Sequence, residues 1–167
     1  TEDDDVSDLI ISETDLTVEE EDTTEATFTV KLSSEPTSDV VINVTSGDTG
    51  EATVDVSSLT FTAGNWDDEQ TVTVTAVDES IDDGDQTTDI TLSIDDDDSD
   101  DTYDPLDDKT VEVVTEDDDV SAFVVSETDL TVEEEDTTEA TFTVKLSSEP
   151  TSDVVINVMS SDTGEAT

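Results

Sequence analysis

The feature that most limits the fold of this chain is an internal repeat. Residues 115–167 repeat residues 1–53 with six differences in 53 positions, so the period is 115 − 1 = 114 residues. The differing pairs are Asp8/Ala122, Leu9/Phe123, Ile10/Val124, Ile11/Val125, Thr45/Met159 and Gly47/Ser161. Because a fixed period marks one structural unit per copy, each unit must be built within one period.

The second copy reaches Thr167 without a counterpart of residues 54–114. We expect residues 1–5 to be the tail of a preceding repeat, residues 6–119 to form a complete module, and residues 120–167 to be the first half of a second module. Half a module leaves its core face and a strand edge uncovered. Two interpretations stay open: the array continues beyond this stretch, or another chain completes the half module by strand addition.

Apolar and polar residues alternate along the repeat, as in Thr27–Leu32, where Phe28, Val30 and Leu32 share one face. This period of two predicts strands, and the frequent Thr favours them. The alternation marks seven strands: around Leu16 and Val18, and within 27–32, 40–44, 59–61, 71–76, 90–94 and 111–113. Seven strands in one repeat are typical of a Greek-key or Ig-like β-sandwich. We therefore predict an all-β fold repeated in tandem, with Trp66 closing one end and Tyr103 packing an acidic loop onto the body.

The charge of the chain limits its partners. It has 51 acidic residues, three lysines, no His and no Cys, for a net charge of −48. Binding to nucleic acid requires basic side chains, and anionic membranes repel such a surface. No stretch approaches the roughly 20 apolar residues of a membrane span. Metal cations are therefore the expected partners, and the apolar residues, 31% of the chain, favour a folded protein over a disordered acidic one.

The residue types also argue against an enzyme. There is no His or Cys, and no Ser stands beside a suitable base. Glycosidase-type chemistry needs one carboxyl group held in an apolar cleft with a raised pKa, whereas the acidic runs here fall in polar turns. We expect no catalytic residues.

Dense acidic runs follow several predicted strands. They include residues 3–5, 19–22, 78–85, 95–101 and 117–119. Neighbouring carboxylates repel one another unless a cation lies among them. Ca²⁺ takes six to eight oxygen ligands in irregular geometry, whereas zinc and copper favour His or Cys, so Ca²⁺ is the first expectation and Mg²⁺ the second. The alternative is a solvated surface of a halophilic protein, because at about 1 M salt the Debye length falls to roughly 3 Å.

Five stretches, taken in order, resemble the Calx-β domain, a seven-stranded calcium-binding sandwich found in sodium–calcium exchangers, an integrin and many bacterial surface proteins. They are Leu16-Thr-Val-Glu-Glu20, Asp48-Thr-Gly-Glu-Ala52, Leu59-Thr-Phe-Thr-Ala-Gly64, Val77-Asp-Glu-Ser-Ile-Asp-Asp83 and Val111-Glu-Val-Val-Thr-Glu-Asp-Asp-Asp119. The resemblance covers residues 6–119. The chain departs from the family at Thr49-Gly50-Glu51, where Gly-Thr is usual, and at Gln86-Thr87, where Glu and Phe are common.

The resemblance implies a set of calcium ligands at one end of the sandwich. They are Glu20, Asp48, Asp78, Glu79, Asp83, Asp117, Asp118 and Asp119, with Glu134 and Asp162 from the second copy. It also implies an extracellular or cell-surface module of a fibre, filament or surface layer, in which Ca²⁺ rigidifies the modules and their junctions. Its partners would be other copies of the repeat in cis, with trans contacts left open. The alternative is a spacer of a large adhesin whose binding domain lies elsewhere.

Overall fold

A computed structural model describes residues 6–21, 24–133 and 138–164. The chain divides into two compact units, Thr1–Glu79 with Asp83–Asp118, and Ser80–Asp82 with Asp119–Thr167. The expected tail over residues 1–5 lies outside the described residues. The elements of the described part are strands, and none of it forms a helix that could cross a membrane.

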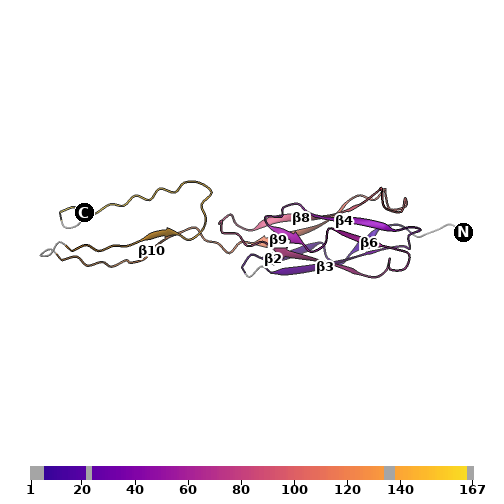
Figure 1. The fold of residues 1–167 in the computed structure, drawn as a ribbon, viewed down its shortest axis with the longest axis horizontal. Helices are drawn as coiled ribbons and strands as arrows, with labels where there is room; N and C mark the ends of the chain where they lie inside the picture. The colour runs from indigo at the N-terminus through magenta and orange to yellow at the C-terminus, as the bar shows by residue number, and fades with distance from the viewer. Residues whose placement is uncertain (1–5, 22–23, 134–137, 165–167) are drawn as a thin grey trace. The chain divides into compact units, whose positions relative to one another are not determined.

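The first unit is a sandwich of two sheets (Figure 1). One sheet has the order β1 (Leu9–Ile11), β3 (Glu25–Leu32), β7 (Gln70–Ala76) and β5 (Ala52–Val54). The other has the order β2 (Asp15–Glu19), β9 (Lys109–Glu116), β8 (Gln86–Ile94), β4 (Val40–Ser46) and β6 (Ser58–Phe61). Neighbouring strands are antiparallel, apart from β2 and β9, which run parallel with Asp15 opposite Glu112 and Glu19 opposite Glu116. The predicted all-β sandwich is confirmed.

The predicted number of strands is wrong, because residues 6–21 and 24–118 form nine. The two additional strands, β1 and β5, have three residues each, too few to show an alternating pattern. Their positions are set by neighbours distant in sequence, since Leu9 lies opposite Leu32 and Ala52 lies opposite Ala76. These strands are therefore products of tertiary pairing rather than of local sequence.

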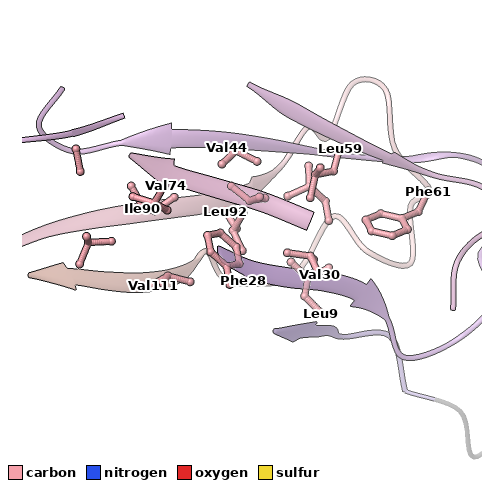
Figure 2. Close-up of a cluster of buried hydrophobic side chains, with 14 of the residues drawn as sticks. Leu9, Phe28, Val30, Val44, Leu59, Phe61, Val74, Ile90, Leu92 and Val111 are labelled. Atoms are coloured by element: carbon pink, nitrogen blue, oxygen red, sulfur yellow. The ribbon is translucent and has the colours of Figure 1, made fainter. Parts of the chain in front are cut away.

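The core lies between the two sheets, as Figure 2 shows for Phe28, Val30, Ile90 and Leu92. Along β3 and β7 every second residue is buried, and Thr fills many of the alternate, outward-facing positions. Burying one such apolar side chain contributes roughly 1.5–3 kcal/mol. The predicted core positions are buried, apart from Leu16 and Ile94, which are partly buried against the cluster.

The chain changes sheet at each connection from β1 to β8, and only the β8–β9 connection stays within one sheet. That connection, residues 95–108, carries Tyr103, which is fully buried in the core cluster. Its hydroxyl group donates to the Ser34 carbonyl oxygen at 2.7 Å. Trp66 packs partly buried against the core. Both aromatic residues therefore take the packing roles predicted for them.

The second unit keeps only part of this pairing. Its strands β10 (Phe123–Val125) and β11 (Val144–Leu146) are antiparallel, with Phe123 opposite Leu146. Leu9 and Leu32 are opposed in the same way in the first unit, 114 residues earlier. Within residues 119–133 and 138–164, no other strand is formed.

Candidate cation site

Six carboxylate side chains follow or precede strands at one end of the first unit. Glu20 follows β2, Asp48 follows β4, Glu51 precedes β5, Glu79 follows β7, Asp83 precedes β8 and Asp117 follows β9. Backbone hydrogen bonds join these ends: Glu20 N–H donates to the Glu116 carbonyl oxygen at 3.2 Å, and Val77 N–H donates to that of Glu51 at 2.9 Å. We call Glu20, Asp48, Glu51, Glu79, Asp83 and Asp117 the carboxylate cluster.

Glu20 is the most buried member of the cluster, with 1% of its surface exposed. Its Oε2 atom has no hydrogen-bond partner among the described residues. Burial is the largest cause that raises the pKa of Glu20 to about 7, followed by the charges of Glu51, Asp117, Glu79 and Asp83. A buried carboxylate among other carboxylates is costly unless it binds a proton or a cation.

Glu51 lies in the same environment. Its Oε2 atom is also buried without a hydrogen-bond partner among the described residues. Burial, and then the charges of Asp83 and Asp48, raise the pKa of Glu51. Glu51 was not among the residues that the sequence implied as ligands. The sequence signal that could have identified Glu51 is its place beside the turn at Asp48. The burial of its Oε2 atom depends on the loops that cover it, which the sequence does not reveal.

Other members of the cluster are positioned by the backbone. Asp117 Oδ2 accepts a hydrogen bond from Gly84 N–H at 2.7 Å. Gly84 has a φ of 77°, which favours glycine over residues with a Cβ atom. Asp48 Oδ1 accepts from Gly50 N–H at 2.8 Å, forming a tight turn before β5. These bonds leave further oxygen lone pairs on both carboxylates.

Neither lysine of the first unit balances this charge. The first unit has two lysines, and each pairs elsewhere: Lys31 Nζ lies 3.5 Å from Glu69 Oε1, and Lys109 Nζ lies 3.1 Å from Asp8 Oδ1. Both pairs are partly exposed, so they contribute little to stability. Charge balance in the cluster must therefore come from protons or from ions in solution.

The cluster is not a preformed coordination site. Among the described residues, no three acidic side chains are arranged to hold a metal ion as they stand. The two buried oxygen atoms without hydrogen-bond partners fit a cation, because they are hard anionic ligands of the kind that Ca²⁺ and Mg²⁺ prefer. A bound ion would require the surrounding side chains to turn toward it.

The structure brings together five of the residues implied by the sequence, Glu20, Asp48, Glu79, Asp83 and Asp117. Asp78 and Asp118 are exposed, and Asp119 belongs to the second unit. In the second unit, Asp162 Oδ1 accepts from Gly164 N–H at 2.9 Å, the same turn that Asp48 forms. Glu134 lies outside the described residues.

A second acidic segment, the β8–β9 connection, is organised differently. Asp100 is buried, and its Oδ2 accepts hydrogen bonds from Thr37 N–H at 2.6 Å and Ser38 N–H at 2.9 Å. Its Oδ1 accepts from the Thr102 hydroxyl at 2.6 Å. Hydrogen bonds, led by that from the Thr102 side chain, hold the pKa of Asp100 well below its usual range. Asp100 is therefore a structural anchor whose charge is satisfied by the protein.

Comparison with known proteins gives a limited set of likenesses. No family model matches the chain, and no curated protein matches it. Among solved structures, it is similar to domains 4 and 5 of the S-layer protein SbsC, with 24% identity and a TM-score of 0.44 over 67% of this chain and 53% of that one. It is also similar to the Escherichia coli chaperone DraB, with 8% identity and a TM-score of 0.46 over 66% of this chain and 55% of that one. The chain thus spans about half the length of each.

Proposed function

We propose that the chain is a structural tandem-repeat module of an extracellular surface fibre, filament or surface layer, related to Calx-β domains. In this proposal Ca²⁺ binds at the carboxylate cluster and stiffens the end of each module. The observation that supports it is the burial of Glu20 and Glu51 with unpartnered oxygen atoms, in a unit whose lysines lie elsewhere. Exposed carboxylates alone would be explained by a solvated surface.

A cation would link strand ends that are far apart in sequence. Glu20 follows β2, Glu51 precedes β5, and Asp117 follows β9. One ion shared by these side chains opposes separation of both sheets at this end of the sandwich. It also removes the mutual repulsion of the carboxylates, which otherwise weakens the folded state.

The same ion would influence how the chain leaves the module. Asp117 stands three residues before Val120, where the second repeat begins, and no Gly- or Pro-rich linker separates the copies. We propose that fixing Asp117 restricts the path of the chain into the next module. Small-angle scattering of a multi-repeat chain tests this: chelation at moderate salt should change the maximum dimension, and an unchanged dimension contradicts it.

Thermal unfolding of the intact chain tests the cation site itself. The fluorescence of Trp66, the one tryptophan, reports on the first unit. Three buffers are needed: low salt with chelator, low salt with Ca²⁺, and high monovalent salt with chelator. A specific site predicts a stabilisation that grows with the logarithm of the Ca²⁺ concentration once that concentration exceeds Kd. Equal stabilisation by monovalent salt alone would contradict a specific site and support general screening.

Glu20→Gln distinguishes the site from the rest of the surface. This change removes one buried ligand charge and should abolish most of the Ca²⁺ effect on the first unit. Glu13→Gln is the matched control, because it removes the same charge from an exposed position outside the cluster. If both variants lose the Ca²⁺ effect equally, the proposal fails.

A further inference from the structure

The second unit carries an exposed apolar face. The equivalent residues of the first unit are buried, so the first unit shows which segments can cover this face. Val154, Phe142 and Val132 are 54%, 42% and 47% exposed. Their counterparts 114 residues earlier, Val40, Phe28 and Val18, are each at most 1% exposed. In the first unit these residues lie on strands that pair with strands drawn from residues 52–118: Val40 lies opposite Phe61 of β6, Phe28 opposite Val72 of β7 and Val18 opposite Thr115 of β9.

A cavity in the second unit marks one place where the missing cover would fit. It has a volume of about 220 Å³ and is lined by Ser121, Ala122, Phe123, Leu146, Ser148, Pro150 and Val154. A cavity of about 150 Å³ is enough for a benzene-sized ring. Its lining is mainly apolar, with the Ser148 hydroxyl as a polar group that an aromatic hydroxyl could meet.

The first unit identifies the side chain that fills the equivalent space. Ser148 corresponds to Ser34, whose Oγ lies 3.0 Å from the Tyr103 hydroxyl and whose carbonyl oxygen accepts from it at 2.7 Å. Leu146 and Val154 correspond to Leu32 and Val40, which share the buried core cluster with Tyr103. The cavity is therefore the counterpart of the Tyr103 site.

The adjacent turn gives a second point of recognition. Residues 147–152 have the same sequence as residues 33–38. In the first unit, the backbone N–H groups of Thr37 and Ser38 both donate to Asp100 Oδ2. Thr151 and Ser152 present the same backbone pattern for a carboxylate three residues before a tyrosine.

We propose that the exposed face formed by residues 120–133 and 138–164 is an acceptor surface for a second copy of the segment 52–118. The tyrosine of that copy enters the cavity beside Ser148, and its Asp100 binds the turn at Thr151 and Ser152. Strands equivalent to β7, β8 and β9 then cover Phe142, Val154 and Val132. This inference does not depend on cation binding, so it stands or fails separately from the proposed function.

The charge of both partners sets the conditions for binding. Segment 52–118 and the acceptor surface are both strongly acidic. At low ionic strength their repulsion opposes association, and at about 1 M salt it is screened within roughly 3 Å. Apolar burial then governs the affinity, so binding strengthens as NaCl rises.

The test adds a polypeptide of residues 52–118 to the full chain in 1 M NaCl with chelator. Hydrogen exchange should show new amide protection at residues 154–158, the counterpart of the central strand β4. The single methionine, Met159, is 88% exposed and provides one isotope-labelled methyl signal that should shift on binding. The proposal is overturned if residues 154–158 gain no amide protection. It is also overturned if the added polypeptide only replaces the chain's own residues 52–118 on residues 6–53.

Variants of the added polypeptide test the cavity and the turn. Tyr103→Ala should weaken binding at least about 100-fold, because a buried aromatic anchor is removed. Asp100→Asn should weaken it about tenfold, since a charged acceptor of two backbone donors is lost. Asp97→Asn is the matched control, an exposed residue of the same loop. Equal binding by the Tyr103→Ala and Asp97→Asn polypeptides contradicts the proposed fit.

Variants of the acceptor test the face. Val154→Asp should abolish binding, whereas Val155→Asp should retain it, because its counterpart Val41 alternates with the buried residues of β4. Unchanged Trp66 fluorescence shows that the first unit is intact in both. As a second form of the test, residues 54–118 can be joined directly after Thr167, which restores the register of the repeat. Residues 154–158 that stay unprotected in this longer chain would also overturn the proposal.

Discussion

Residues 6–53 and residues 120–164 have nearly the same sequence but different surroundings. In the first copy, Phe28 and Val40 are buried and their strands pair with β7 and β6, and in the second copy Phe142 and Val154 are exposed. Both copies keep the short pairing of Leu9 with Leu32 or of Phe123 with Leu146. The difference teaches that the first half of a repeat contains all the residues this pairing needs, while the longer strands β2, β3 and β4 depend on partners from residues 52–118.

The largest expected effect separates the two copies directly. Phe28→Ala should lower the free energy of unfolding of the first unit by about 3–5 kcal/mol, because it leaves a cavity in the core. Phe142→Ala, at the same place in the second copy, should leave the stability of the first unit within about 0.5 kcal/mol of the original chain. Chemical denaturation in 1 M NaCl, followed by Trp66 fluorescence, measures both. Equal losses would mean that the second copy supports the first unit.

The second prediction concerns the carboxylate cluster. The pKa of Glu20 is raised from its ordinary value of 4.5 to about 7, so the folded state binds its proton more tightly than the unfolded state. Without divalent cations, stability is therefore lost as pH rises from about 4.5 to about 7, with Glu20 accounting for up to about 3 kcal/mol. Glu20→Gln should flatten this part of the pH profile.

Glu134→Gln is the matched control for that experiment. It changes the same position of the second copy. Residues 120–167 repeat only residues 6–53, so they contain no equivalents of Glu79, Asp83 and Asp117. The pH profile of the first unit should keep its slope in this variant. Denaturant unfolding at pH 4.5, 6 and 8 with chelator compares the three chains, and a slope that survives Glu20→Gln would assign it to other carboxylates.

The third prediction concerns the turn shared by the two copies. Asp100→Asn should destabilise the first unit by about 2 kcal/mol, because the turn at Thr37 and Ser38 loses its charged acceptor. The pKa of Asp100 is lowered, so its contribution is present above the ordinary aspartate pKa and is lost as pH falls through the folded value. Asp97→Asn should change stability by less than about 0.5 kcal/mol. Similar melting of both variants would show that Asp100 is not an anchor.

The smallest expected effect uses a difference between the copies. Gly47 N–H donates to the Asp89 carbonyl oxygen at 2.9 Å, and a Cβ atom at Gly47 would lie 3.2 Å from that oxygen. Gly47→Ser, which installs the residue found at position 161, should cost the first unit about 0.5 kcal/mol. Ser161→Gly should leave the unfolding of the first unit unchanged. A loss of stability above about 2 kcal/mol would show that the backbone around Gly47 and Asp89 cannot shift to make room for a Cβ atom.

The sequence predicted those parts of the fold that depend on alternation. The core faces of β3, β7 and β8 follow directly from apolar residues at every second position. The strands β1 and β5 could not be predicted this way, because three residues do not establish a period and their pairing partners lie elsewhere in the chain. The role of Asp100 was likewise hidden, since its donors, Thr37 and Ser38, stand more than 60 residues away.

The candidate site was predicted in part. The resemblance to Calx-β domains implied that Glu20, Asp48, Glu79, Asp83 and Asp117 lie at one end of the sandwich, and the structure brings these five together. Sequence could not separate these from Asp78 and Asp118, which are not among the charges that raise the pKa of Glu20 or Glu51, because the distance between two carboxylates depends on how each loop folds back. Glu51 was missed for the same reason.

The parallel pairing of β2 with β9 has a mechanical consequence. β2 lies near the start of the module and β9 is its last strand, and they are joined over five register positions from Asp15–Glu112 to Glu19–Glu116. A pull on the two ends of the module draws these strands past each other along their length. Their hydrogen bonds are then loaded together in shear, instead of opening one after another like a zip. A module joined in this way resists tension along the chain through the paired strands β2 and β9.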